Sequence, residues 1–281
     1  MLCFPNCKIN LGLFITQKRD DGYHDLETVF YPLHAQTSAL AGYSMLRDVL
    51  EVVPASSTQM HLSGLTVAGD NKDNLVWKAY NLLHGQFPGK VPALDIYLHK
   101  VIPMGAGLGG GSADGAFMLS LLNDYCGLGL NKEQLAGYAL QLGSDCPFFI
   151  YNTPQFATGR GEQMTASTLD LSAYSIQLIC PHVHVSTATA FSSITPRPAT
   201  YNLRLLSALP LVQWHDKLRN DFEEPVFKSH PALASIKQQL YDQGALYAAM
   251  SGTGSTIFGI FPKGQQATVK TDVGFESYCI T

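Results

Sequence analysis

Glycine dominates the segment of this chain that is best suited to chemistry. Residues 103–114 read Pro-Met-Gly-Ala-Gly-Leu-Gly-Gly-Gly-Ser-Ala-Asp, and a helical pattern begins directly after them. Glycine reaches backbone angles that other residues avoid, and it lets the main chain approach a ligand closely. Successive amide N–H groups in such a loop can converge on an anion, and the positive end of a following helix adds to the attraction. The segment therefore predicts a phosphate-binding loop.

Two common phosphate loops fit this segment poorly. Residues 105–110 match the dinucleotide pattern G-x-G-x-x-G, but that loop follows a fully apolar parallel strand and precedes a strand that ends in an acid. Here the preceding strand is amphipathic, and helix, loop and helix follow. A Walker A loop is excluded because no Gly-Lys-Ser or Gly-Lys-Thr closes the segment. An NAD(P)-binding oxidoreductase stays open as an alternative.

Lys8, Asn10 and Asp145 are further candidates for chemistry. Over residues 8–16, isoleucine and leucine alternate with Lys8, Asn10, Gly12, Phe14 and Thr16, which predicts a half-buried strand. Lys8 and Asn10 would then point the same way, about 6–7 Å apart along the strand. Asp145 lies between a predicted helix and the apolar residues 147–151. Taken alone, a lysine on a strand is usually solvated and an aspartate after a helix is usually a turn residue.

Periodicity and capping residues predict the elements that would position these groups. Residues 18–22 read as a turn, residues 23–33 as a returning strand, and residues 94–99 as a strand that leads into the glycine loop. Three helices follow from capping signals: one capped by Asp73 or Asn74, one by Ser112, and one opened by the capping box Asn131–Gln134 and ended near Gly143. Their inward residues are Val76, Ala79, Tyr80 and Leu83; Met118, Leu121, Leu122 and Tyr125; and Leu135, Tyr138, Ala139 and Leu142.

The second half of the chain reads as another α/β unit. Strands are predicted over residues 176–180, 247–250 and 256–261, and a helix from Pro231 through Leu240 that Gly244 ends. Residues 152–154 are the expected boundary between the halves.

Composition restricts the class of protein. The 281 residues are 46% hydrophobic and 14% charged, which allows a sizeable core and argues against disorder. A net charge of −4 argues against a nucleic-acid partner. The six cysteines include no C-x-x-C pair, and no apolar stretch has the length of a membrane span or a secretory leader. We expect a soluble, cytoplasmic protein without a membrane partner; its oligomeric state is not predicted.

Several segments together resemble the GHMP kinases (galactose, homoserine, mevalonate and phosphomevalonate kinases). The phosphate loop of that family, P-x-x-x-G-L-G-S-S-A, is matched from Pro103 to Ala113, except that Gly-Gly-Ser replaces the serine pair. Residues 251–255, Ser-Gly-Thr-Gly-Ser, are similar to its third motif. One branch of the family is closer still, because its K-[IL]-N-L, D-G-Y-H, G-[AS]-D-[VC]-P-F and N-D-[LF]-E motifs are matched at residues 8–11, 21–24, 143–148 and 220–223.

The resemblance implies a mixed α/β (α+β) fold with two domains. An ATP-binding, ribosomal-S5-like domain would span residues 1–153 and a ferredoxin-like domain residues 154–281, with both substrates in a cleft between them. The activity would be ATP-dependent phosphorylation of a small molecule, with Mg²⁺ as the companion of ATP. In the closer branch, the acceptor is the 2-hydroxyl of a cytidine diphosphate ester of a small polyol, on the non-mevalonate route to isoprenoid precursors. Alternatives are a kinase of homoserine or a mevalonate-like alcohol, and a catalytically silent nucleotide-binding module.

The resemblance also implies roles for individual residues. Asp145 would accept or orient the proton of the acceptor hydroxyl, and Lys8 would neutralise charge on the transferred phosphate and keep Asp145 ionised. The expected ATP-binding residues are Pro103, Met104, Gly105, Ala106, Gly107, Leu108, Gly109, Gly110, Gly111, Ser112, Ala113, Asn74 and Lys100. The expected substrate-binding residues are Asn10, Tyr23, His24, Thr187, Phe191, Gly252 and Gly254, of which Tyr23, His24 and Phe191 would recognise the cytosine base. No metal site is predicted, because His182 and His184 have no third ligand at suitable spacing.

Overall fold

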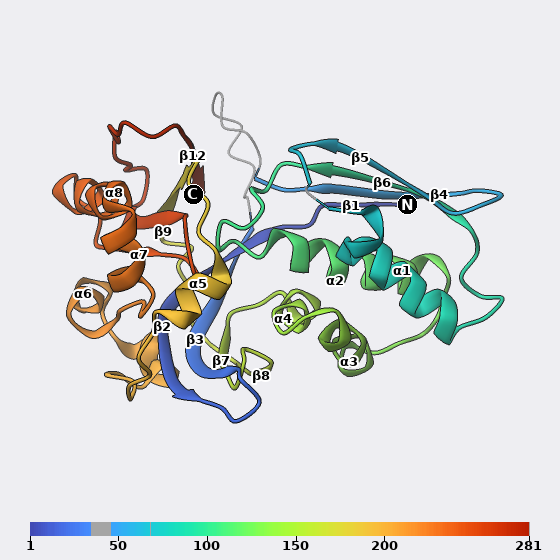
Figure 1. Ribbon diagram of the computed structural model, residues 1–281, viewed down its shortest axis with the longest axis horizontal. Coiled ribbons are helices and arrows are strands. Elements are labelled where there is room, and N and C mark those ends of the chain that lie inside the picture. Colours follow the sequence, from blue (N-terminus) through green and yellow to red (C-terminus); the bar gives the residue numbers. More distant parts are fainter. Residues whose placement is uncertain (35–45, 68, 281) are drawn as a thin grey trace. The chain divides into compact units, whose positions relative to one another are not determined.

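The computed structural model describes residues 1–34, 46–67 and 69–280. The chain folds into two compact units, and neither is continuous in sequence (Figure 1). Unit 1 contains Met1–Cys7, Leu46–Met104 and Gly109–Thr153, and unit 2 contains Lys8–Met45, Gly105–Leu108 and Pro154–Thr281. The glycine loop therefore contributes residues to both units. The division into residues 1–153 and 154–281 follows chain order instead, and it stays a prediction.

Unit 1 is a four-stranded sheet with helices on one face (Figure 1). The strand order is β1-β4-β6-β5, in which β4 is antiparallel and β5 parallel to β6. Along β6, Leu94, Ile96 and Leu98 are buried while Tyr97 and His99 are exposed, so the predicted half-buried strand is confirmed. The elements are β1 (Leu2–Cys3), β4 (Val49–Pro54), β5 (Gln59–Gly64), η1 (Asn71–Asp73), α1 (Leu75–Gln86), β6 (Leu94–Lys100), α2 (Gly110–Tyr125), α3 (Lys132–Leu142) and α4 (Cys146–Tyr151).

Side-chain caps start two of these helices where the sequence predicts. The Asn74 side chain accepts a hydrogen bond from the Val76 amide at 2.9 Å and caps α1, which buries Val76, Ala79, Tyr80 and Leu83. Asn131 and Gln134 form the expected capping box of α3. Both predictions are confirmed, since short polar side chains satisfy amides that a helix leaves unpaired at its start.

The prediction that Ser112 caps α2 is wrong. The helix begins at Gly110, and Gly109 precedes it with a positive φ of 73° and no side-chain cap. The Ala113 amide already donates to the Gly109 carbonyl at 2.9 Å, so Ser112 lies inside the first turn. Glycine reaches this left-handed conformation at little cost, and the chain can therefore enter the helix without a serine cap.

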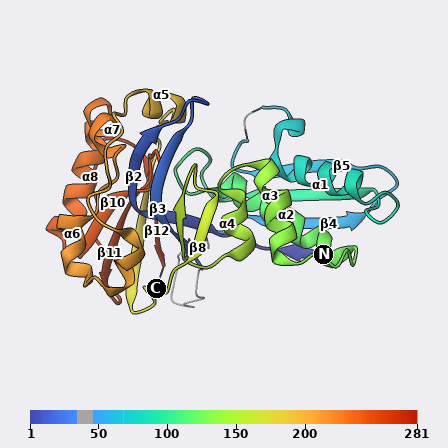
Figure 2. The same cartoon turned by 90° about the horizontal axis from the view of Figure 1, so that it is seen from below.

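Unit 2 contains two four-stranded sheets and the remaining helices (Figure 2). The first sheet has the order β2-β3-β7-β8 and the second β10-β11-β9-β12. Every described strand pair of the second sheet is antiparallel. The elements are β2 (Cys7–Lys18), β3 (His24–Leu33), β7 (Gln155–Thr158), β8 (Gln163–Ala166), β9 (Tyr174–Pro181), α5 (Thr187–Ser192), η2 (Leu203–Ala208), η3 (Leu211–Gln213), α6 (Trp214–Lys217), α7 (Glu223–Ser229), α8 (Pro231–Asp242), β10 (Tyr247–Met250), β11 (Ile257–Pro262) and β12 (Phe275–Ile280).

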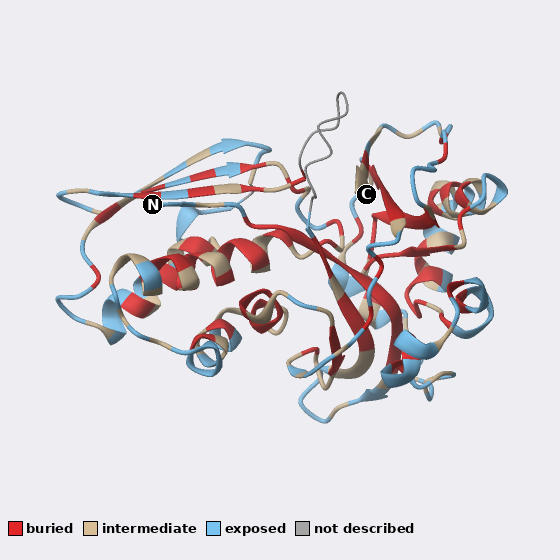
Figure 3. Cartoon of the chain, turned by 180° about the vertical axis from the view of Figure 1, so that it is seen from behind, coloured by how far each residue is buried: buried red, intermediate tan, exposed pale blue. Residues whose placement is uncertain are grey.

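Strand β2 differs from its prediction in burial. Both of its faces are buried from Cys7 to Ile15, as the continuous red of β2 in Figure 3 indicates. Phe14 is 0% exposed, and a Cβ on Gly12 would lie only 3.0 Å from a side-chain carbon of Leu203. Alternation predicted one solvated face, but contacts from distant parts of the chain cover it. Lys8 and Asn10 consequently lie inside the protein and not on its surface.

The strands and helix of the second half agree with their predictions. Both ends of strands β9, β10 and β11 lie within two residues of the predicted segments. Helix α8 starts at Pro231, buries Leu233, Ile236 and Leu240, and packs against β10 and β11 (Figure 2). Residues 251–255 form the tight turn between β10 and β11.

Candidate active site

Lys8 lies at the centre of a polar cluster in unit 2. Its side chain is 3% exposed, and its ammonium donates to the Asn10 side-chain oxygen at 2.6 Å and to the Gly107 carbonyl at 3.2 Å. Its own amide donates to the Leu108 carbonyl at 2.9 Å. Strand β2 thus places a buried positive charge beside the glycine loop. A buried ammonium needs hydrogen-bond acceptors or an anion to offset its lost hydration.

Residues 251–256 bind the main chain of the glycine loop. The Ser251 hydroxyl donates to the Gly107 carbonyl at 2.8 Å and accepts from the Asn10 amide at 3.3 Å. The Thr256 amide donates to the Ala106 carbonyl at 3.2 Å. Gly252 packs so closely that a Cβ there would lie 3.2 Å from the Gly107 Cα. Glycines at these positions therefore let two loops pack side by side.

Asn220 holds the second of these loops in place. Its side-chain amide donates to the Met250 carbonyl at 2.8 Å and the Gly252 carbonyl at 2.7 Å, and its oxygen accepts from the Phe222 amide. The next acids of the same motif bind other strands: Asp221 accepts from the Ile15 amide and Glu223 from the Met250 amide, both at 2.8 Å. Asn220 and Glu223 thus hold the start of the 251–255 turn, and Asp221 holds β2.

The second part of the glycine loop belongs to unit 1 and opens α2. The first amides of a helix have no partner within it, and they carry the positive end of its dipole. Gly110 packs against Ile102, and a Cβ there would lie 2.8 Å from a side-chain carbon of that residue. The backbone at 109–112 therefore combines the first amides of a helix with little side-chain bulk. This arrangement fits a phosphate group.

Asp145 immediately precedes α4 in unit 1, and its side chain does not cap that helix. Its neighbour Cys146 is buried, and burial raises the pKa of that thiol to about 12. A hydrogen bond between the Cys146 thiol and the Ser112 side chain acts in the opposite direction on that pKa, and the charge of Asp145 raises it further. The start of α2 and the residue next to Asp145 are therefore in contact, and α2 packs on α4.

Lys100, an expected ATP-binding residue, is deeply buried beneath α2. Its side chain is 1% exposed and pairs with Asp48 and, at 2.6 Å, with Asp114. The other oxygen of Asp48 accepts from the Val101 and Ile102 amides at 2.6 and 2.9 Å. This buried cluster fixes the segment that leads into the glycine loop. A contact of Lys100 with ATP stays a prediction, and its burial argues against that contact.

The expected base-recognition residues have different neighbours within unit 2. The His24 ring lies 5.2 Å from the Phe191 ring, whereas the Tyr23 ring is covered by Arg160. Partial burial and the charge of Lys18 lower the pKa of His24, which favours the neutral imidazole. The Thr187 hydroxyl lies 3.3 Å from that of Thr253, in the 251–255 turn. His24, Phe191 and Thr187 thus all belong to unit 2, as Lys8 does.

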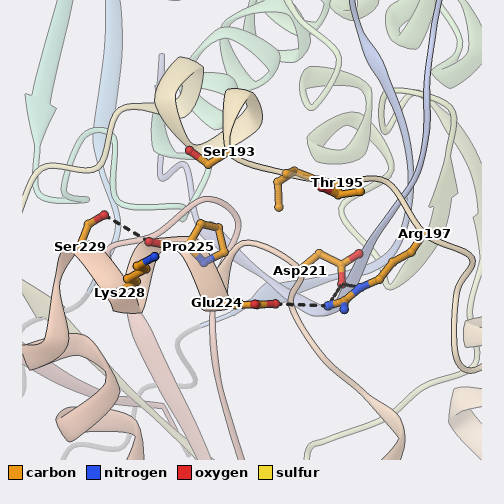
Figure 4. A pocket seen from close by; sticks show the side chains of 9 residues that line it. Ser193, Thr195, Arg197, Asp221, Glu224, Pro225, Lys228 and Ser229 are labelled. Carbon is orange, nitrogen blue, oxygen red and sulfur yellow. Dashed lines mark hydrogen bonds and ion pairs between the residues drawn. The ribbon is translucent and has the colours of Figure 1, made fainter.

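A separate cavity of about 610 Å³ opens in unit 2 near the end of α5 (Figure 4). Three of its charged residues pair with one another, since Arg197 binds Asp221 at 3.2 Å and lies 4.0 Å from Glu224. None of the predicted site residues lines it. The lining residues are Ser193, Ile194, Thr195, Arg197, Asp221, Glu224, Pro225, Lys228 and Ser229.

Comparison with known proteins decides the family. Residues 74–153 match the model of the GHMP kinases N terminal domain, and residues 204–278 match that of the GHMP kinases C terminal. A 4-diphosphocytidyl-2-C-methyl-D-erythritol kinase of Parabacteroides distasonis is 48% identical over 94% of this chain and 92% of its own. The chain belongs to the GHMP kinases. A kinase of the same name from Bacteroides thetaiotaomicron is 46% identical over 99% of this chain and 98% of its own.

Solved structures show the same two-domain GHMP kinase fold. A crystal structure of 4-(cytidine 5'-diphospho)-2C-methyl-D-erythritol kinase matches with a TM-score of 0.74 and 30% identity, covering 92% of this chain and 90% of the other. A homoserine kinase from Cytophaga hutchinsonii matches with a TM-score of 0.69 at 15% identity, covering 99% of this chain and 95% of its own, which supports the fold alone. The GHMP assignment replaces the dinucleotide-binding alternative for the glycine loop.

The contacts of two residues next to the glycine loop were not predicted from the sequence. Ser251 and Asn220 fall inside the S-G-T-G-S and N-D-F-E segments, but nothing local indicates that they bind the main chain of the glycine loop and the turn. Among the described residues, no group of three His, Cys, Asp or Glu could hold a metal ion. His182 and His184 have different neighbours, Gly274 and Gly105. Within the described ranges, no helix is long and apolar enough to cross a bilayer.

Proposed function

We propose that this protein transfers the γ-phosphoryl group of ATP to the 2-hydroxyl of 4-diphosphocytidyl-2-C-methyl-D-erythritol. The observation that carries the proposal is the buried ammonium of Lys8, which donates to the Gly107 carbonyl of the glycine loop. Phosphoryl transfer needs positioned charge more than covalent chemistry. Relatives at 43–48% identity carry the name of this kinase, which supports the choice of acceptor over homoserine or mevalonate.

Lys8 supplies the fixed positive charge in this proposal. Its ammonium donates to two neutral oxygens, Asn10 Oδ1 and Gly107 O. In a buried site, an ammonium stabilises negative charge on the transferred oxygens more strongly than it would in water. It also favours the ionised form of a nearby carboxylate.

Asp145 is assigned to bind the acceptor hydroxyl. A carboxylate that accepts a hydrogen bond from the hydroxyl orients its oxygen for attack, and it can take the proton as the new bond forms. Its position supports this assignment, because Asp145 lies within the matched G-[AS]-D-[VC]-P-F motif and directly precedes α4.

The glycine loop is assigned the ATP phosphates. Main-chain amides at the start of α2 would bind the phosphate oxygens, with Gly105–Leu108 close to Lys8 in unit 2. Mg²⁺ bound to ATP neutralises phosphate charge. The pathway is the non-mevalonate synthesis of isoprenoid precursors, and the expected location is the cytoplasm.

A phosphoryl-transfer assay over a panel of alcohols tests the proposal. ADP release should occur with ATP and the cytidyl acceptor, and should be far slower with homoserine or mevalonate. Lys8→Met and Asp145→Asn should each lower kcat by about 100-fold or more while both proteins stay folded. Asp170→Asn, on an exposed turn, is the control. Transfer to homoserine or mevalonate alone, or full activity in both variants, would contradict the proposal.

A further inference from the structure

Arg160 covers one face of the Tyr23 ring. Its guanidinium carbon lies 4.7 Å from the ring centroid, within the range of a cation–π contact. Tyr23 is nevertheless 55% exposed. The ring is thus in contact with Arg160 and still largely accessible to a ligand.

The main chain fixes both partners of this contact. Arg160 lies in the turn between β7 and β8, where its amide donates to a Glu162 carboxylate oxygen at 2.6 Å. The carbonyl of Gly159, its neighbour, accepts from the Leu26 amide on β3 at 2.7 Å. The β7–β8 turn is therefore bonded to the strand that begins just after Tyr23.

Asp21 fixes the Tyr23 side of the contact. Its carboxylate accepts from the Tyr23 amide at 3.1 Å and binds Arg19. The hydrogen bond from Arg19 is the largest cause of its lowered pKa, and the charge of Arg160 contributes to the same shift. A negative group thus lies near the guanidinium, and it favours the position of Arg160 beside Tyr23.

We propose that Arg160 is a positioning residue for the pyrimidine base of the acceptor. By covering one face of Tyr23, it holds the ring with its other face presented for stacking on the base. Holding the ring before binding reduces the conformational entropy that is lost when the base stacks. This inference rests on the proposed function, because it takes Tyr23 as a base-binding residue.

Kinetics of matched arginine variants test this role. Arg160→Ala should raise KM for the cytidyl acceptor about two- to five-fold, the loss of one exposed cation–π contact, with kcat and KM for ATP unchanged. Arg160→Lys should recover part of the loss. Arg204→Ala is the matched control, since Arg204 makes the same kind of contact, 4.2 Å over the ring of Phe156, which is not a predicted site residue. It should leave KM unchanged.

The dependence on Tyr23 separates positioning from direct contact. In a Tyr23→Ala background, Arg160→Ala should change the acceptor KM by less than about 1.5-fold, because the contact no longer exists. An unchanged KM in the single variant, or an undiminished effect in the Tyr23→Ala background, would overturn the inference.

Calorimetry of cytidine 5′-diphosphate binding separates the test of Arg160 from the test of the proposed reaction. Wild type should bind it two- to five-fold more tightly than Arg160→Ala. If wild type binds this nucleotide in that order but transfers no phosphate to the cytidyl acceptor, the proposed reaction fails and the role of Arg160 stands. Equal affinity in the two proteins overturns the role of Arg160 alone.

Discussion

Gly107 and Ser251 approach so closely that a Cβ on Gly107 would lie 1.9 Å from the Ser251 carbonyl oxygen. The φ of Gly107 is also positive, at 79°. The close packing of the glycine loop on the 251–255 turn therefore depends on the absence of a side chain at this one residue.

Gly107→Ala should destabilise the protein by about 3 kcal/mol or more, because a steric clash adds to the cost of a left-handed backbone. Urea unfolding measures the change. Gly111→Ala is the control, since its Cβ would meet only the end of Met104 at 3.6 Å and alanine favours a helix. Equal stabilities of the two variants would contradict the close approach.

Asn220→Asp should destabilise unit 2 by about 3 kcal/mol. The change replaces an amide that donates to two carbonyls with a carboxylate that repels them, in a site that is 4% exposed. Asn202 offers a matched comparison, because its side-chain oxygen accepts from the Arg204 amide, a bond that a carboxylate can also accept. Chemical denaturation should find Asn202→Asp within about 0.5 kcal/mol of wild type. A similarly small effect at Asn220 would show that its two hydrogen bonds do not hold the turn.

The raised pKa of Asp114 should make the free energy of unfolding decrease as pH rises. Burial raises its pKa well above the ordinary value; Lys100 opposes this shift, and the charge of Asp48 adds to it. Above about pH 4, the unfolded carboxyl has lost a proton that the folded one still holds, so the folded state binds more protons and stability decreases with pH up to the folded pKa.

Asp114→Asn should remove that part of the pH dependence. Urea unfolding of wild type and variant between pH 5 and pH 8 measures the two slopes. Asp170→Asn should keep the wild-type slope, because the Ser172 hydrogen bonds lower the pKa of this exposed carboxyl and both states are ionised throughout the interval. Identical slopes in wild type and Asp114→Asn would show that Asp114 is ionised in the folded state.

Asn74 allows its capping role to be separated from the predicted ATP contact. Asn74→Ala should lower stability by about 1 kcal/mol through loss of the α1 cap, while Asn74→Asp should retain it. If Asn74 contacts ATP, the aspartate should raise KM for ATP by charge repulsion at unchanged stability. An unchanged KM for ATP in Asn74→Asp would limit Asn74 to the cap.

The sequence by itself determined the elements whose signals are local. The α1 cap at Asn74, the capping box at Asn131, the alternation of β6 and the start of α8 at Pro231 depend on neighbouring residues, and each lies where it was predicted. The spacing of the motifs likewise identified the family, because glycine loops and short polar motifs are contiguous in the chain.

Only the tertiary structure decided which of these groups meet. The burial of Lys8 and Asn10, the pairing of Lys100 with Asp48, and the contact of Arg160 with Tyr23 join residues that are far apart in sequence or depend on distant covering segments. Ser112 shows the same limit at short range, since the positive φ of Gly109 made its capping role unnecessary. Hydrogen bonds and packing between distant segments have no periodicity in the chain, so residue patterns alone could not predict them.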